Sequence, residues 1–545
     1  MNPINGPAGG AAASSRGQHP VRLLESRVTQ RRGLGVRHAA AFAALVCGSS
    51  GAWAQTVSQA TPENLPPLLQ PQVREHAANS PTALSDPYPI QAAGWGPPAG
   101  QRYFISRWAE DWSKLKAQSK ALPLKAMPLI GDDVTLTLSS ELRTRVDAYS
   151  DAALIRGNDF HQTEFRAIVG GDLRLGQHFR VYGELGTAQI RGQSDIYTPN
   201  FRGTAVPANY RNDLSVQQLF GEARTYVGDD LLVGVMAGRM EFTDGPRQII
   251  SISDGPNLHR TWNGVRLYAH HRKFRVGAFD FKVTRPGSGA FDETVNHDEQ
   301  LKGANASIAV LNDKASGDLF VEPFLYRVTN IRDAAGSTAA PGRRDTWGAR
   351  VWGNRGPVQW DWTAFRQTGV HDGRKVDAWA ASFIQNMLVY NGNGVRVRAG
   401  GHVDLASGGN SYGTRGSIRS FNQLYASVGY LGQGLLLSQS NIVVVAPAVA
   451  IAPVQGLTIN LDYAFLHRQN QNDAIYGGLM RPYAGTQNVR GSDVGTYARA
   501  TASWSITSNL TLDLEAERLF AGDVLKKAGY PKGGTYGMTS LTFRY

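Results

Sequence analysis

Apolar and charged residues alternate along most of this chain, from about residue 131 to the C-terminus. Within residues 134–149 one set of alternate positions is largely apolar, and the other carries Glu141, Arg143, Arg145 and Asp147. Successive side chains of a β-strand point to opposite faces of a sheet, so the pattern predicts long strands with one apolar and one charged face. Few folds accept such strands, because the two faces need different surroundings.

The connections between the alternating segments are short and long in alternation. Gly228-Asp229-Asp230 and Gln455-Gly456 are short, whereas 406–439 and 469–492 are long and rich in Gly, Asn and Asp. Outer-membrane barrels have tight periplasmic turns and longer outer loops. The expected strands lie near 133–149, 163–175, 179–190, 215–227, 231–242, 258–270, 274–284, 299–311, 318–329, 345–353, 357–368, 377–389, 394–405, 440–453, 457–468, 493–506, 510–520 and 534–545.

The fold class predicted is therefore all-β, a transmembrane antiparallel β-barrel of about 18 strands with short periplasmic turns and long outer loops. A sheet is stable in hydrocarbon only when it closes, because every backbone polar group must be paired. At about sixteen to eighteen strands side chains no longer fill the interior, which becomes a water-filled channel. No segment reaches the roughly 18 apolar residues of a membrane helix, and the single cysteine, Cys47, excludes a disulfide scaffold.

The N-terminal region predicts export to the bacterial outer membrane. Basic residues near Arg31 precede an apolar run and an Ala52-Trp53-Ala54 cleavage pattern. Part of the net charge of +12 belongs to this leader, so we expect no nucleic-acid partner. The predicted parts are a signal peptide at 1–54, a Pro/Ala-rich extended periplasmic segment at 55–100, a short ordered arm at 101–130 and the barrel at 131–545.

The charged faces of the predicted strands would line the interior of such a barrel. Arginine dominates them, and its forked, permanently charged guanidinium suits carboxylate groups. Rings of arginine select anions, so we expect a channel for anionic saccharides. The alternative is a general or sugar-uptake porin with little polymer specificity, in which the charges pair within the wall. The candidate lumen and substrate-binding residues are Arg143, Arg145, Arg166, Arg174, Arg180, Arg239, Arg260, Arg266, Arg396, Arg398, Arg499, Glu141 and Glu222.

Residues 100–545 resemble the alginate export family of outer-membrane barrels. The similar segments are Arg107-Trp108-Ala109-Glu110-Asp111-Trp112, Gly238-Arg239-Met240-Glu241-Phe242, 255–266 and Phe421-Asn422-Gln423-Leu424-Tyr425. The resemblance implies an eighteen-stranded barrel whose arginine-rich constriction passes a polyuronate such as alginate outward. Met240 stands where the family usually has Gln, and Asn263 where it has Asp. These departures bear on alginate as the substrate and leave the expected fold unchanged.

No catalytic or metal site is predicted, and we expect no enzyme and no cofactor. Residues 409–413 match G-x-S-x-G, but no strand precedes them and no helix follows them. His270-His271 lies in an expected turn, and no P-loop, dinucleotide fingerprint or His/Cys cluster is present. The residues interpreted as membrane-interface belts are Trp347, Trp352, Trp360, Trp362 and Trp379.

The expected partners follow from the predicted location. They are outer-membrane lipid, the barrel assembly machinery and the anionic polysaccharide or acidic sugar that is transported, with a periplasmic scaffold lipoprotein as a further candidate. We expect a monomer. The long segment 406–439 is expected to occlude part of the lumen.

Overall fold

The computed structural model describes residues 103–112, 122–131, 133–192, 206–244, 249–313, 317–335, 338–412, 415–427 and 429–545. The predicted signal peptide and the extended segment 55–100 lie outside the described residues. Within the expected arm, residues 103–112 include the 3-10 helix η2 (Arg107–Ala109), and the second described piece includes strand β1 (Met127–Ile130).

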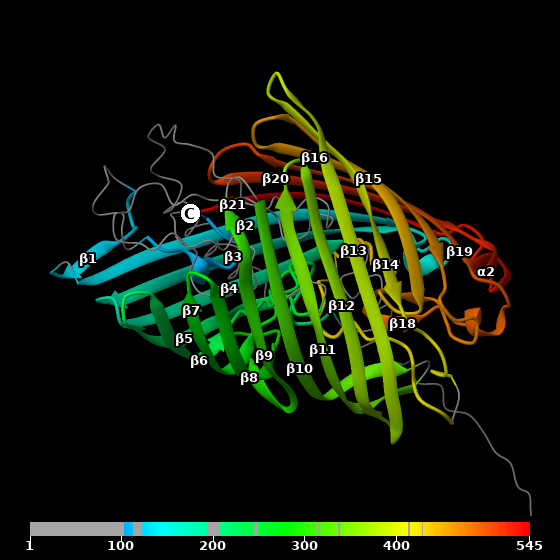
Figure 1. Cartoon of the computed structure of the whole chain (residues 1–545), viewed down its shortest axis with the longest axis horizontal. Helices are drawn as coiled ribbons and strands as arrows, with labels where there is room; N and C mark the ends of the chain where they lie inside the picture. Colours follow the sequence, from blue (N-terminus) through cyan, green and yellow to red (C-terminus); the bar gives the residue numbers. More distant parts are fainter. Residues whose placement is uncertain are drawn as a thin grey trace, which may run out of the picture. The chain divides into compact units, whose positions relative to one another are not determined.

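Eighteen long antiparallel strands pair in chain order, and the last of them, β21, pairs back to the first, β2, so that the sheet closes (Figure 1). Strand β1 extends the same edge of β2 beyond the end of β21. The predicted barrel is confirmed, and each expected strand has a counterpart. The barrel strands are β2 (Val134–Ser150), β3 (Phe160–Leu175), β4 (Phe179–Gly192), β5 (Asn212–Val227), β6 (Leu231–Met240), β7 (Trp262–His271), β8 (Phe274–Arg285), β9 (Thr294–Asp313), β10 (Gly317–Ala335), β11 (Thr338–Arg355), β12 (Val358–His371), β13 (Arg374–Gly392), β14 (Val395–Ala406), β15 (Ile442–Val454), β16 (Leu457–His467), β19 (Asp493–Ser505), β20 (Leu510–Ala521) and β21 (Gly534–Arg544).

Short and long connections lie at opposite ends of the barrel. At one end the connections between strands have two to four residues, the longest being 506–509. At the other end two connections, 336–337 and 372–373, have only two residues each, because β10 to β13 continue beyond their expected ends. The described residues of two longer connections enter the barrel: inner loop 1 (241–261, between β6 and β7) and inner loop 2 (407–441, between β14 and β15). The small helix α2 (Asp523–Lys527) and the two-residue strands β17 (Tyr476–Gly477) and β18 (Arg481–Pro482) belong to the remaining long connections.

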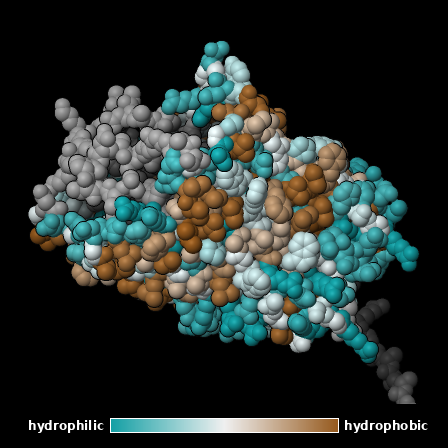
Figure 2. Space-filling model, viewed as in Figure 1, coloured by the Kyte–Doolittle hydropathy of each residue, from teal (hydrophilic) through white to brown (hydrophobic). Residues whose placement is uncertain are grey.

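Alternate residues of each barrel strand differ in exposure. In β2 the odd-numbered residues from Thr135 to Tyr149 are buried, whereas Val146 is 42% exposed. The buried rows face the interior, where loop segments cover them, and the exposed rows face outward. The outward rows are largely apolar, and Figure 2 shows apolar residues gathered in a broad band across the strands of one face. Among the described residues, no helix has the length and apolar character needed to cross a bilayer.

An arginine placed in the middle of the outward band is expected to destabilise the barrel. Ala364 of β12 faces outward. On one side of it along the strand is Arg366, whose partners on the neighbouring strands are Trp347 and Trp379, and on the other side is Trp360. Ala364→Arg is expected to cost about 2–4 kcal/mol, and Thr368→Arg, nearer the interface, about 0–1 kcal/mol. Guanidinium unfolding in lipid vesicles measures both values. Equal costs at the two positions would contradict the assignment of this face to lipid.

Candidate functional site

The inner wall formed by β2 and β3 carries a lattice of buried charges. The register places Arg143 opposite Arg166 and Arg145 opposite Glu164. Arg166 Nη2 lies 2.5 Å from Glu141 Oε1, and Arg143 Nη2 lies 3.4 Å from Glu164 Oε2. Two guanidinium groups can face each other on a buried wall only when carboxylates compensate both of them.

Inner loop 1 supplies a further carboxylate to this wall. Asp254 Oδ1 accepts hydrogen bonds from Arg166 Nη1 at 2.7 Å and from Arg143 Nη1 at 3.1 Å. The backbone oxygen of Gly255 accepts a hydrogen bond from Arg145 Nη1 at 2.9 Å. The arginines predicted to bind substrate therefore also hold this loop inside the barrel.

A histidine of the same loop lies between two carboxylates. His259 Nδ1 is 2.6 Å from Glu241 Oε1, and Nε2 is 2.7 Å from Asp254 Oδ1. Burial lowers the pKa of His259, but the carboxylates of Glu241 and Asp254 together more than offset this and raise it to about 10. Burial raises the pKa of Asp254, but the guanidinium groups of Arg166 and Arg143 hold it well below its usual range. At neutral pH the cluster is therefore a network of ions rather than of neutral hydrogen-bonding groups.

The two inner loops are joined to each other. The backbone N–H of Tyr425 in inner loop 2 donates to Ile249 O at 3.0 Å, and Ser251 N–H donates to Tyr425 O at 3.0 Å. Arg260 Nη1 donates to Ser251 O at 3.0 Å and to Tyr425 O at 2.8 Å. Any movement of one loop across the interior must therefore break contacts with the other.

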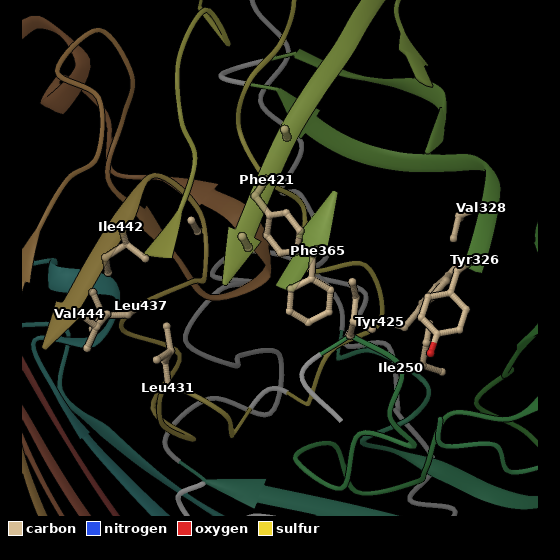
Figure 3. Close-up of a cluster of buried hydrophobic side chains, with 14 of the residues drawn as sticks. Ile250, Tyr326, Val328, Phe365, Phe421, Tyr425, Leu431, Leu437, Ile442 and Val444 are labelled. Carbon is tan, nitrogen blue, oxygen red and sulfur yellow. The ribbon is translucent and has the colours of Figure 1, made fainter. Parts of the chain in front are cut away.

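Inner loop 2 also covers an apolar part of the inner wall. Figure 3 shows Phe421 of the loop beside Phe365 of β12, and Leu437 beside Val444 of β15. The rings of Phe365 and Phe421 are 5.6 Å apart. The loop lies inside the barrel, as expected for segment 406–439, and it shields from water inward residues that would otherwise be exposed.

Hydrogen bonds tie inner loop 2 to the wall formed by β19 and β20. Arg499 Nε donates to Glu515 Oε1 at 2.7 Å, and its Nη2 donates to Gly429 O at 3.1 Å. The backbone N–H of Gly434 donates to both carboxylate oxygens of Glu517 at 3.1 Å. Inner loop 2 therefore contacts barrel strands that are remote from its own ends.

The N-terminal arm occupies the interior at the short-turn end. Arg180 Nη2 donates to Trp108 O at 2.5 Å, and Arg174 Nη1 lies 2.8 Å from Asp111 Oδ1. The Trp108 ring meets the ring of Phe220, on the inward row of β5, edge-on at 6.0 Å. Two of the predicted lumen arginines thus bind the arm.

A narrow cavity remains between the arm, inner loop 1 and the wall. Its volume is about 40 Å³, which leaves room for only a few water molecules. Passage of a saccharide along this wall therefore requires the arm or inner loop 1 to move. Polar and charged side chains on the cavity lining are Arg143, Arg145, Arg544, Asp254, Asp513, Glu515, Thr501, Ser540 and Thr542.

Most of the predicted lumen residues lie in inward rows, and carboxylates accompany several of the arginines. Arg145 Nε is 2.8 Å from Asp147 Oδ1, and Arg174 Nε is 3.0 Å from Asp172 Oδ2. Glu222 accepts a hydrogen bond from the Tyr268 hydroxyl. The predicted residues in inward rows are Arg143, Arg145, Arg166, Arg174, Arg180, Arg266, Arg396, Arg398, Arg499, Glu141 and Glu222.

The prediction that Arg239 lines the lumen is wrong. Arg239 is in register with Leu219, which is 55% exposed on the outward row of β5. Met236 and Met240 lie on the inward row of β6, and both are buried. Arg239 Nη1 lies 2.8 Å from Glu293 Oε1, in a connection at the long-loop end. Apolar residues face inward on this strand because side chains of the protein, and not water, fill the interior beside it.

Two further residues differ from expectation. Arg260 was expected on a strand, but β7 begins at Trp262, so Arg260 belongs to inner loop 1. Trp352 was expected in an interface belt, but it faces inward, is 2% exposed and stacks on Phe320 with ring centres 4.5 Å apart. In both cases, packing inside the barrel decides the position.

Sequence patterns missed the residues through which the inner loops attach. Asp254, Asn257, His259 and Tyr425 lie outside strands, where alternation gives no information about direction. Asn257 Nδ2 donates to the backbone oxygen of Phe165 at 2.9 Å and thereby fixes inner loop 1 to β3. The available signals were the segments that resemble the family, 255–266 and 421–425, which contain Asn257, His259 and Tyr425 but not Asp254.

Potential catalytic groups have structural partners in this fold. Ser411 Oγ is hydrogen-bonded to Ser420 Oγ and to Asp473 Oδ2. His402 Nδ1 lies 2.5 Å from Asp404 Oδ2, on the inward row of β14. Within the described part of the chain, no three His, Cys, Asp or Glu residues are grouped so that they could hold a metal ion.

The barrel is similar to solved outer-membrane proteins. OccAB1 of Acinetobacter baumannii superposes with a TM-score of 0.50 at 11% identity, covering 78% of this chain and 99% of that one. OccK8 (OprE) of Pseudomonas aeruginosa superposes with a TM-score of 0.47 at 12% identity, covering 75% and 98%. No match was found among curated proteins.

A family model described as alginate export matches residues 134–537, which span the barrel from β2 into β21. Together with the closed barrel, this match places the protein in the bacterial outer membrane, surrounded by lipid, as a channel. Both the fold and the family are of a type that transports rather than catalyses. The chain belongs to the alginate export family.

Proposed function

We propose that this outer-membrane channel passes anionic saccharides, either polyuronates such as alginate or related acidic sugars, through a lumen lined with arginine. The single observation that carries the proposal is a pair of arginines, Arg396 and Arg398, that have no carboxylate partner in the part of the chain that the structure describes.

Arg396 and Arg398 lie on the inward row of β14, which also contains the buried His402 and Asp404. Arg396 is exposed, and Arg398 Nη1 donates to Asn386 Oδ1 at 2.9 Å. Among the described residues, neither arginine forms an ion pair with an acidic side chain. The pair is close to the turn that joins β13 and β14, at the short-turn end, which is the periplasmic end in barrels of this class.

Uncompensated charges at the mouth of a channel dominate its selectivity. The arginines of the β2–β3 wall are neutralised by Glu141, Asp147, Glu164 and Asp254, so they contribute little net potential. Two positive charges without counterions in a confined opening instead concentrate anions from the periplasm. The guanidinium fork also matches the carboxylate of a uronate.

A second candidate is a porin of broad specificity. The ion pairs of the β2–β3 wall favour it, because a wall of matched charges offers hydrogen bonds to neutral sugars as readily as to acidic ones. The two candidates differ in the sign and size of ionic selectivity.

Reversal potentials in planar bilayers under a salt gradient test the proposal. The wild-type channel is expected to prefer anions, and Arg396→Gln/Arg398→Gln to reduce the anion-to-cation permeability ratio by roughly tenfold. Arg272→Gln is the matched control, since Arg272 is 59% exposed in a short turn at the same end and lies 3.7 Å from Asp230. Weak selectivity in the wild type, or an equal change in the control, would favour the broad porin.

A further inference from the structure

A strip of charged residues crosses the outward face of β8 to β13 near the long-loop end. The register places Asp280 beside Lys302, Lys302 beside Arg327, and Arg327 beside Asp345. Basic residues outnumber acidic ones in the strip. The outer charged strip consists of Lys302, Arg327, Arg343, Arg366, Lys375, Asp280, Asp345 and Asp377.

The strip lies at the height where the apolar band ends. Trp347, Arg366 and Trp379 are successive partners across β11, β12 and β13, and the two tryptophans are 52% and 37% exposed on the outward face. Tryptophan is enriched at the boundary between hydrocarbon and headgroups. Asp345 lies two residues beyond Trp347, about 7 Å further along the strand. The strip is therefore level with lipid headgroups rather than acyl chains.

Two arginines of the strip share a single carboxylate. Arg327 Nε lies 2.5 Å from Asp345 Oδ1, and Arg343 Nε lies 3.4 Å from Asp345 Oδ2. Their side chains are 56% and 50% exposed. In the described structure no acceptor is bonded to the Nη atoms of either residue. The pair therefore keeps one net positive charge and several N–H donors on exposed side chains.

Among the described residues, no side chain of a long connection bonds to Arg327 or Arg343. Inner loop 2 reaches the strip only at the β13 edge, where Ile418 N–H donates to Lys375 O at 2.8 Å. The connections from β10 to β11 and from β12 to β13, 336–337 and 372–373, have two residues each. The occupant must therefore be a molecule that lies against the outside of the barrel at headgroup height and carries negative charge. Phosphate fits the guanidinium fork, and acyl chains of the same molecule would pack on the apolar band below.

We propose that the outer charged strip binds the phosphate groups of a phosphorylated glycolipid of the outer leaflet, such as the lipid A part of lipopolysaccharide. Arg327 and Arg343 hold a phosphate with their Nη groups, Lys375 flanks it with further positive charge, and Trp347 packs on the sugar–acyl boundary. This role concerns the outside of the barrel and does not depend on the solute that passes through it.

Native mass spectrometry of the purified full-length barrel in detergent tests the proposal, with bis-phosphorylated lipid A as the probe. Arg327→Gln/Arg343→Gln is expected to weaken binding by roughly tenfold, while Arg327→Lys/Arg343→Lys keeps part of it. Arg518→Gln is the matched control, because Arg518 lies on the outward row of β20 and donates to Thr535 and Lys532 O. Heat-modifiable migration on gels shows that each variant is folded.

The lipid and phosphate contributions are separated by two further probes. Dephosphorylated lipid A is expected to bind wild type and the Gln variant equally weakly, and inorganic pyrophosphate is expected not to compete at equal concentration. Equal binding of lipid A to wild type and the Gln variant, or an equal loss in Arg518→Gln, overturns the proposal. Competition by pyrophosphate would show a phosphate site that does not need lipid, and would overturn the assignment to a glycolipid.

Discussion

Replacing residues 409–439 of inner loop 2 by a short Gly/Ser linker is expected to raise single-channel conductance about threefold or more, because the interior of an eighteen-strand barrel is otherwise wide enough for a water-filled channel. The loop packs Phe421 against Phe365 and is tied to β19 and β20 through Arg499 and Glu517. Planar-bilayer recording of wild type and variant measures the change. An unchanged conductance would show that the arm or inner loop 1 sets the constriction instead.

The control for this deletion is an engineered disulfide that joins the two inner loops reversibly. Ile250 and Tyr425 form a parallel bridge between the inner loops, and neighbouring strands are about 4.8 Å apart, within the span of a disulfide. The chain has one cysteine, Cys47, in the predicted leader, so Ile250→Cys/Tyr425→Cys introduces a defined pair. The oxidised form is expected to conduct less than the reduced form. Equal conductance in both forms would mean that the loops do not separate when the channel conducts.

Removing the carboxylate of Asp254 is expected to be the most destabilising single substitution in the interior. Arg143, Arg166 and His259 all contact Asp254 Oδ1 and are buried. Asp254→Ala leaves these cations with too few counterions, which costs about 3–5 kcal/mol. Guanidinium unfolding in vesicles measures the loss. If Asp254→Ala only detaches inner loop 1 and the barrel stays folded, the rate of proteolysis within inner loop 1 is expected to increase.

The control for Asp254→Ala is the removal of a carboxylate from an exposed ion pair. Asp523→Ala removes the partner of Lys527, where both side chains are more than 60% exposed, and is expected to cost less than about 1 kcal/mol. Equal losses for Asp254→Ala and Asp523→Ala would contradict the burial argument.

The effect of Asp254→Ala is expected to depend on pH in a defined direction. The pKa of His259 is raised to about 10 in the folded protein, above a value of about 6.5 in an unfolded chain. The stabilisation from its proton is therefore complete below pH 6.5 and is lost as the pH rises through 10. The difference between wild type and Asp254→Ala should shrink above pH 10, because neutral His259 no longer needs the Asp254 charge. A difference that stays constant to pH 11 would show that His259 is not the titrating partner.

Alternation along the chain was sufficient to predict every barrel strand, because the direction of a side chain in a strand depends only on its place in the pleat. It also placed Arg143, Arg145, Arg166 and Arg499 on inward rows. The family resemblance followed from short segments such as 255–266 and 421–425, and the outer-membrane location followed from the alternating strands.

Tertiary structure alone decided what fills the barrel. The rule that apolar residues face lipid fails at Met236, Met240 and Trp352, where the interior contains protein, and it misplaced Arg239 for that reason. The attachments of Asp254 and Tyr425 join segments far apart in the chain and have no periodicity that a sequence could reveal. Local pleating therefore determines which residues share a face, but only the packing of loops and arm inside the barrel determines which face meets water, lipid or protein.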